Sequence, residues 1–470
     1  MNLNRVSLFG RASLAGREGV LERFLGMFAD VRGREAWTAI LLMSNLFILL
    51  TAYLIIKTVR EPLILASGGA EIKSYAAAGQ AILLLLIVPV YGFIATKVNR
   101  IKLITCVVLF FISNLVVFYV LGRLQVPLGV VFFLWVGIFN LLVIAQFWSF
   151  ANDVYTQEQG KRLFALVAFG GSLGAIVGPK IAGWLFEPLG PYSLMLVTAA
   201  LLGVYLVIMI LVNAREKRPR ESSAVEPPVS EKPLGKEGAF QLIVNQPYLL
   251  LIAVLLVALN LVNTTGEFIL GKTVTARAQE LVALERTETQ AAGVAQSTPS
   301  PQRERAIHAF IGEFYANFFF WVSLISALVQ LFLVSRIIKY LGVSAALFVL
   351  PMIAAGGYSF IVFMPVLSTI MAAKMIENSV DYSLQNTCRH ALFLPTSREA
   401  KYKAKAAIDS FFVRAGDVLS SVVVFIGVQL ALDTGSIAKI NIAFAILALL
   451  LVAGIVPHYK RLTAQAEPAA

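Results

Sequence analysis

Long apolar stretches separated by short polar connections follow one another along almost the whole chain. A helix needs about 20 apolar residues to cross a bilayer, and twelve stretches are close to that length. They lie at residues 37–60, 75–96, 102–122, 127–151, 162–186, 191–213, 247–271, 308–334, 340–363, 366–387, 406–431 and 437–457. This pattern predicts an all-α polytopic membrane protein with twelve transmembrane helices.

Basic residues cluster in alternate connections, after the second, fourth, sixth, eighth and tenth stretches, and again in the tail at 460–470. Cytoplasmic loops collect Lys and Arg, so we expect both termini in the cytoplasm. Residues 1–36 interleave arginines with apolar side chains and contain no apolar core of a cleavable signal. They are either an amphipathic helix on the cytoplasmic leaflet or a basic tail.

The stretch at 214–246 is rich in Pro, Ser and charge, which predicts a flexible cytoplasmic linker. It separates a first lobe at 37–213 from a second lobe at 247–459, each with six of the apolar stretches. Two such parallel halves resemble the major facilitator architecture, whose binding site lies between the halves at mid-membrane. Within the second lobe, 272–307 is an outer insertion that we expect to form a short surface helix and a disordered turn.

Composition agrees with this class, because 58% of the residues are hydrophobic and 14% are charged, against about 25% charged in soluble proteins. The net charge of +12 follows mainly from the cytoplasmic connections, and no soluble basic domain is present to bind nucleic acid. The three histidines are scattered without metal-ligand spacing. We therefore expect no metal, no cofactor and no enzymatic activity. The expected partners are the bilayer and a small anionic substrate.

Basic side chains inside the apolar stretches are candidates for binding that substrate, because a charge in lipid is costly unless it faces a cavity or a partner. Lys57 and Arg60 lie three residues apart, and they either bind a ligand or anchor a helix end at the interface. Lys180 lies deep in its stretch and needs an anion or a partner from another helix.

Charged residues also recur at helical spacing in the tenth and eleventh stretches. Lys374, Glu377 and Asp381 fall on one stripe, and Arg414 precedes Asp417 by three residues. Such stripes are either structural ion pairs or acids that carry a coupling proton. The residues expected in one of these two roles are Glu267, Lys374, Glu377, Asp381, Asp409 and Asp417.

The sequence GEFILGKT at 266–273 matches the phosphate-loop pattern. A working phosphate loop follows a strand, whereas this one ends an apolar helical stretch. We therefore expect helix here.

Two groups of motifs stand out, FWSFAN at 147–152 with KRLF at 161–164, and KAKAAID at 403–409. They resemble two signatures of the ATP/ADP translocases of plastids and obligate intracellular bacteria. Members of that family exchange ATP for ADP, with two lysines and two glutamates implicated. The resemblance implies that Lys405 keeps the late lysine and that Arg60 takes the place of the first-helix lysine.

The chain also departs from that family. Val136 and Asn263 stand where the family has its glutamates, with Glu267 one turn from the second, and Asp417 replaces a family lysine. The resemblance predicts an inner-membrane nucleotide transporter that exchanges ATP for ADP by alternating access. The alternatives are a proton-coupled transporter of another organic anion, and a non-transporting membrane scaffold. The expected substrate-binding residues are Lys57, Arg60, Lys180, Asn263, Lys405 and Arg414.

Overall fold

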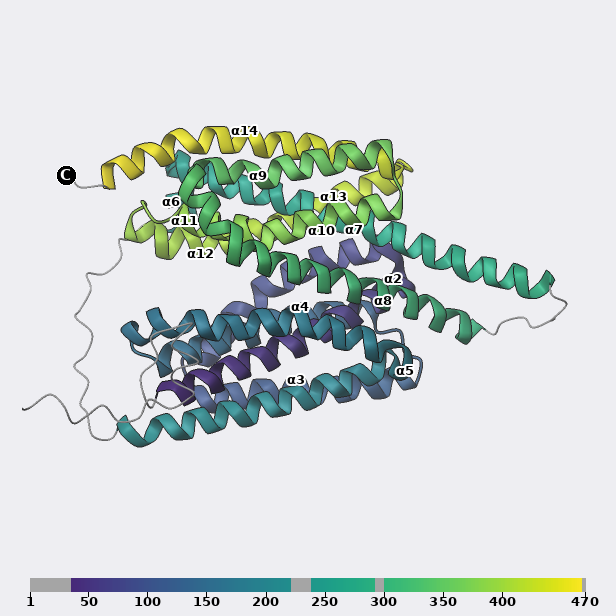
Figure 1. The fold of residues 1–470 in the computed structure, drawn as a ribbon, viewed down its shortest axis with the longest axis horizontal. Coiled ribbons are helices and arrows are strands. Elements are labelled where there is room, and N and C mark those ends of the chain that lie inside the picture. The colour runs from purple at the N-terminus through teal and green to yellow at the C-terminus, as the bar shows by residue number, and fades with distance from the viewer. Residues whose placement is uncertain (1–34, 221–237, 292–299, 467–470) are drawn as a thin grey trace, which may run out of the picture.

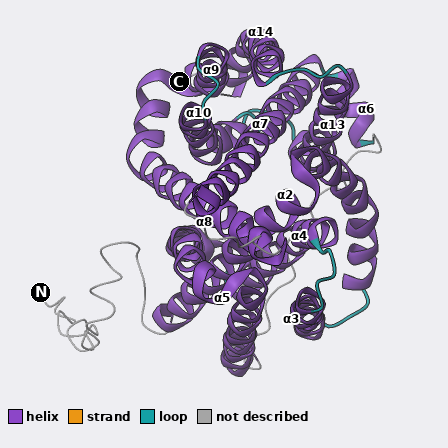
Figure 2. Ribbon diagram, turned by 90° about the vertical axis from the view of Figure 1, so that its right-hand side faces the viewer, coloured by secondary structure: helices purple, strands orange, loops and turns teal. Residues whose placement is uncertain are grey.

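The computed structural model describes residues 35–220, 238–291 and 300–466, and every regular element in these ranges is a helix (Figures 1 and 2). The predicted all-α class is confirmed. Most of the expected N-terminal segment, the centre of the linker, the tip of the outer insertion and the last four residues lie outside the described ranges.

The described part of the first half contains four helical runs. They are α2 (Glu35–Ala95), α3 (Arg100–Arg123), α4 (Gly129–Val154) and α5 (Gln157–Arg220).

The second half begins with the short α6 (Ala239–Asn245) and ends with α14 (Thr434–Ala466). Several of its helices are joined without a break through π-helical turns, which are marked η. Between α6 and α14 follow α7 (Pro247–Ala291), α8 (Ser300–Leu328), η1 (Val329–Val334), α9 (Ser335–Phe363), α10 (Leu367–Val380), η2 (Asp381–Gln385), α11 (Asn386–Ala391), η3 (Ala400–Ala404), α12 (Lys405–Ala407), η4 (Ile408–Phe412) and α13 (Val413–Gln429).

Eight runs within the described residues are long and apolar enough to cross a membrane, so the chain is a multi-pass membrane protein. Three of them extend over 54 to 62 residues. Each of these three contains one glycine in the left-handed region, namely Gly69 at φ 70°, Gly190 at φ 72° and Gly342 at φ 77°. Other residues adopt that conformation at a cost of about 1–2 kcal/mol, so glycine allows the chain to turn there.

The kink at Gly69 corrects one expectation. The sequence suggested that the first helix ends near residue 60, whereas α2 stays helical up to the kink. Lys57 and Arg60 therefore lie within a helix and do not terminate it.

Two predicted connections are also more helical than expected. The linker range contains the end of α5 and all of α6, where Ile243 is buried in the core of the second half. At the outer insertion, α7 continues to Ala291 and α8 already begins at Ser300, so two long helices project from the bundle at the right of Figure 1.

Small residues allow the helices to approach one another closely. A Cβ atom on Gly174 would lie 2.3 Å from the carbonyl oxygen of Phe47, and one on Gly416 would lie 2.8 Å from that of Val257. Both glycines hold a lobe together, since α5 packs on α2 and α13 packs on α7.

The buried apolar residues form one core within each half and a third core that joins them. The joining core includes Ile64 and Phe133 from the first half with Phe268 and Tyr315 from the second. We call this region the closed side. We call the opposite end, where α6, α11 and α12 lie (Figure 1), the open side, because the buried cores described there each belong to one half.

Candidate functional site

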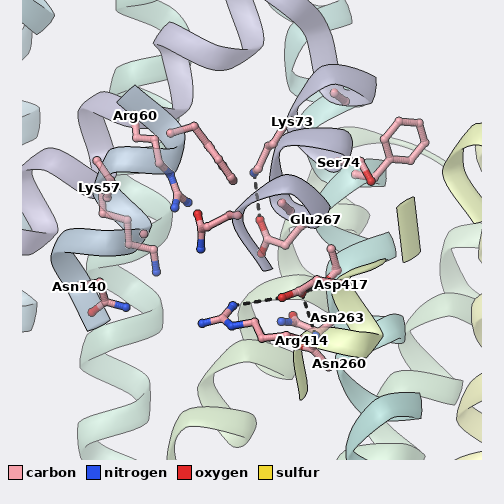
Figure 3. Close-up of a pocket in the computed structure, with 18 of the residues that line it drawn as sticks. Lys57, Arg60, Lys73, Ser74, Asn140, Asn260, Asn263, Glu267, Arg414 and Asp417 are labelled. Atoms are coloured by element: carbon pink, nitrogen blue, oxygen red, sulfur yellow. Dashed lines mark hydrogen bonds and ion pairs between the residues drawn. The ribbon is translucent and has the colours of Figure 1, made fainter. Parts of the chain in front are cut away.

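A central cavity of about 240 Å³ lies between the halves and is lined by polar and aromatic side chains from both. The first half contributes Lys57 and Arg60 before the Gly69 kink, Lys73 after it, and Asn140 from α4 (Figure 3). The second half contributes residues from α7, α8, η2 and α13. The kink in α2 brings two successive stretches of one chain segment to the same cavity.

Four charged residues form a cluster that bridges the halves, which we call the bridging cluster: Arg60, Glu61, Lys73 and Glu267. Lys73 Nζ lies 2.6 Å from Glu61 Oε2 and 3.4 Å from Glu267 Oε2, and Arg60 pairs with the other oxygen of Glu61. Glu61 is fully buried. Since Lys73 and Glu267 belong to different halves, their pair ties the halves together at the closed side.

Lys57 has a different environment. Its ammonium lies 4.4 Å from the centre of the Phe319 ring and 5.7 Å from that of Tyr382. Among the residues that the structure describes, no carboxylate lies within 4 Å of it. Aromatic faces compensate a cation only in part, so Lys57 offers an uncompensated positive charge to the cavity.

Arg414 and Asp417 form an ion pair, one of the two roles expected of them, with 3.1 Å between Arg414 Nη1 and Asp417 Oδ2. The other oxygen of Asp417 accepts hydrogen bonds from Asn260 at 2.8 Å and Thr264 at 2.9 Å. This carboxylate is therefore held on α13 by two side chains of α7.

A second buried pair lies behind the cavity wall. Lys374 is fully buried, and its Nζ lies 3.0 Å from Glu377 Oε1. Lys374 also donates to Asn263 Oδ1 at 2.8 Å, and Tyr358 donates to Glu377 at 2.9 Å. The GEFILGKT stretch is helical, as expected, and a Cβ on its Gly266 would lie 1.9 Å from the Tyr358 hydroxyl.

A larger cavity of about 820 Å³ is lined partly by the same residues, Asn140, Asn260, Asn263 and Arg414, together with residues of η2 and α11 nearer the open side. Asp381 lines it without a cation within 4 Å among the described residues. Three residues near its rim form what we call the mouth cluster: Arg389, Lys405 and Asp409. Lys405 Nζ lies 2.5 Å from Asp409 Oδ2, and Arg389 Nε lies 3.6 Å from Asp409 Oδ1.

The structure brings most of the sequence-predicted residues together. Those that line the central cavity are Lys57, Arg60, Asn263, Glu267, Arg414 and Asp417. Glu377 and Asp381 line the larger cavity. Lys374 lies behind the wall, and Lys405 and Asp409 lie at the mouth.

Lys180 is separate from this group. It lies in a small crevice of about 140 Å³ with Glu313 of α8, and its ammonium is 5.3 Å from the centre of the Phe320 ring. The side chain is exposed, so the expectation that it joins the other cations is corrected.

Sequence reasoning missed Lys73, Asn140, Ser74 and Gln80, all of which line the central cavity. Three of them follow the Gly68-Gly69 pair, where a connection was expected. That glycine pair was the available signal, because it permits a tight turn that returns the helix to the same site. Ser74 and Gln80 are 4% and 9% exposed, and Ser74 Oγ and Gln80 Oε1 have no hydrogen-bond partner within the described ranges.

The buried pair on α10 gives a stability prediction. Lys374→Met leaves Glu377 buried without its counter-charge, and we expect it to lower the free energy of unfolding by about 3–5 kcal/mol. Adding Glu377→Gln should restore most of the loss, because the amide is neutral and still accepts from Tyr358. Thermal unfolding of the detergent-purified variants measures both effects. A double variant as unstable as Lys374→Met would contradict the pairing.

Sequence comparison places the chain among transporters. A sequence profile described as the Major Facilitator Superfamily matches residues 36–388. The ADP,ATP carrier protein 1 of Chlamydia trachomatis is 23% identical over 319 residues, which are 59% of this chain and 54% of that protein. The chloroplastic ADP,ATP carrier protein 1 of Arabidopsis thaliana is 25% identical over 293 residues, 57% of this chain and 43% of that protein. The matched region thus spans about half the length of these relatives.

Solved structures show the same fold at low identity. The nucleoside transporter NupG aligns with a TM-score of 0.61 and 12% identity over 90% of this chain and 99% of its own. A bacterial homologue of the iron transporter ferroportin, in an inward-facing state, aligns with 0.60 and 13% over the same shares. At these identities the likeness concerns the fold alone.

Proposed function

The chain belongs to the Major Facilitator Superfamily, and we propose that it carries a small anionic, nucleotide-like substrate across the membrane by alternating access. The observation that carries this proposal is Lys57, a cation in a cavity that both halves line, with no carboxylate partner among the described residues. An unpaired charge inside a membrane protein is costly unless a ligand or water meets it. Arg60, Arg414 and Asn263 line the same cavity and can share the anion.

We propose a topology of twelve crossings in two lobes, at 37–213 and 247–459. Of the eight long apolar runs, the three with a left-handed glycine each supply two crossings, which gives eleven. The helix from α10 through η2 into α11 is not among those eight runs, and it supplies the twelfth crossing. With the basic connections in the cytoplasm of an inner-membrane protein, both termini and the open side face the cytoplasm. The structure then corresponds to an inward-facing state.

Nucleotides are the first substrates to test, because the chain resembles proteins named ADP,ATP carriers. We propose exchange of one nucleotide for another, and ATP and ADP, the pair those names suggest, are the first exchange to test. Lys405 stands at the mouth, where it can meet a substrate arriving from the open side. Lys180, in its separate crevice, takes no part in this exchange.

Exchange has a direct test in proteoliposomes. Vesicles loaded with unlabelled nucleotide should take up labelled nucleotide several-fold faster than empty vesicles, because an exchanger needs a counter-substrate for its return. ATP, ADP and AMP are each used inside and outside, and vesicles without protein are the control. Equal uptake into loaded and empty vesicles would exclude exchange, and no flux of any anion would favour a non-transporting scaffold.

A second candidate function is proton-coupled transport of an organic anion, and Asp381 is the observation that favours it. Its carboxyl lines the larger cavity with no cation within 4 Å among the described residues. If it carries the coupling proton, a pH gradient should accelerate uptake, and Asp381→Asn should remove that acceleration while substrate binding persists. Uptake measured with and without a gradient checks this. A gradient response unchanged in Asp381→Asn would assign the proton elsewhere.

A further inference from the structure

The fixed charges around the two cavities almost cancel. The bridging cluster is neutral, because it contains two cations and two carboxylates, and the ion pairs within α10 and within α13 are neutral as well. The mouth cluster has one cation in excess, which Asp381 on the same cavity offsets. Among the described residues of this region, the charge that remains is that of Lys57.

This balance does not depend on how the groups are paired. An incoming anion can displace Glu267 from Lys73, or Asp417 from Arg414, but the displaced carboxylate stays at the cavity and repels the same anion. Both carboxylates are also held by neutral donors, Asn378 for Glu267 and Asn260 with Thr264 for Asp417. Rearrangement of the side chains therefore leaves the site with one net positive charge.

A phosphate monoester carries about 1.5–2 negative charges at pH 7, and each further phosphate adds about one more. A monoester or a carboxylate nearly neutralises this site, whereas a triphosphate would leave several buried negative charges without partners, which is unfavourable in a medium of low dielectric constant. Resting on the proposed transport of an anion, we infer that the site selects substrates with about one or two negative charges over the di- and triphosphates of the same compound, so that AMP binds more tightly than ADP or ATP.

Isothermal titration of the detergent-purified full chain, with a chelator present to keep divalent cations off the phosphates, tests this inference. One ligand series is AMP, ADP and ATP, which vary the charge at constant base and ribose. The other is phosphate, pyrophosphate and tripolyphosphate, which vary it without a base. We expect the dissociation constant to rise at least about tenfold with each added phosphate in both series, which corresponds to a loss of about 1.4 kcal/mol in binding free energy per phosphate.

Asp417→Asn makes the test specific to the cavity, since it removes one negative charge at nearly constant volume and frees Arg414. It should reduce the preference for mono- over diphosphate at least about tenfold. Asp433→Asn is the matched control, because Asp433 is exposed and caps α14 outside both cavities. Its preference for mono- over diphosphate should equal that of the wild type. Glu267→Gln serves the same purpose as Asp417→Asn if that variant does not fold.

Each outcome decides a different claim. The inference would be overturned if a triphosphate bound as tightly as the monophosphate, or if the ratio of the di- to the monophosphate dissociation constant stayed unchanged in both Asp417→Asn and Glu267→Gln. Either result would leave the proposed anion transport standing. If none of the six anions binds, the proposed nucleotide-like substrate is wrong, and the inference fails with it.

Discussion

Lys57→Gln is expected to lower anion uptake at least about 30-fold while the protein remains folded. Truncating one partner of a buried, hydrogen-bonded charge pair costs about 2–5 kcal/mol, much of it the penalty of leaving the other charge unpaired. Here that other charge belongs to the substrate. The folded protein itself loses little, since Lys57 contacts aromatic rings and no carboxylate in the part of the chain that the structure describes. Initial uptake rates in proteoliposomes, normalised to the protein reconstituted, give the ratio.

Two further variants separate a binding role from a general loss of charge. Lys57→Arg should recover part of the flux, because it keeps the charge but replaces a compact ammonium with a planar guanidinium. Lys180→Gln removes one positive charge from a crevice outside the central cavity, and we expect it to retain most of the flux. Wild-type uptake in Lys57→Gln, or an equal loss in both lysine variants, would contradict the assignment of Lys57.

Glu267→Gln is expected to weaken closure on the closed side of the cavity. Glu267 supplies the carboxylate with which Lys73 reaches across to the second half. A hydrogen bond to a charged group contributes about 1.5–3 kcal/mol, so its loss should increase the population open on that side about 10- to 150-fold. Lys73 keeps its contact with Glu61 at 2.6 Å, and therefore no buried lysine is left unpaired.

Thiol labelling measures this shift. A single cysteine at Ser74, which lines the central cavity, is introduced after Cys106 and Cys388 are replaced, and an impermeant reagent is added from the closed side. The labelling rate should rise in Glu267→Gln and stay unchanged in Glu280→Gln. Glu280 is a suitable control because it is exposed on the same helix and pairs with Arg277 within that helix. Equal labelling of wild type and Glu267→Gln would show that the pair does not hold the halves together.

Helical spacing was sufficient to predict contacts within one element. Residues three or four apart on a helix are neighbours, and so the pairs Lys374–Glu377 and Arg414–Asp417 could be inferred from the sequence. Apolar length likewise predicted the helical membrane class. The same spacing could not show that Glu377 accepts a hydrogen bond from Tyr358 or that Lys374 donates to Asn263, since those partners come from other helices.

The sequence by itself therefore determined that this is a helical membrane protein in two halves with charged residues inside its apolar segments, because length, hydropathy and period are local properties of the chain. Only the tertiary structure decided which of those charges are neutralised. Lys73 and Glu267 are 194 residues apart, yet they form one pair, and Lys57 and Lys180, equivalent as sequence features, lie in different cavities. Whether the charge of a buried lysine is compensated depends on the side chains that other helices bring within 4 Å of it. For Lys73, the backbone turn at Gly69 sets its position and therefore which carboxylates it meets.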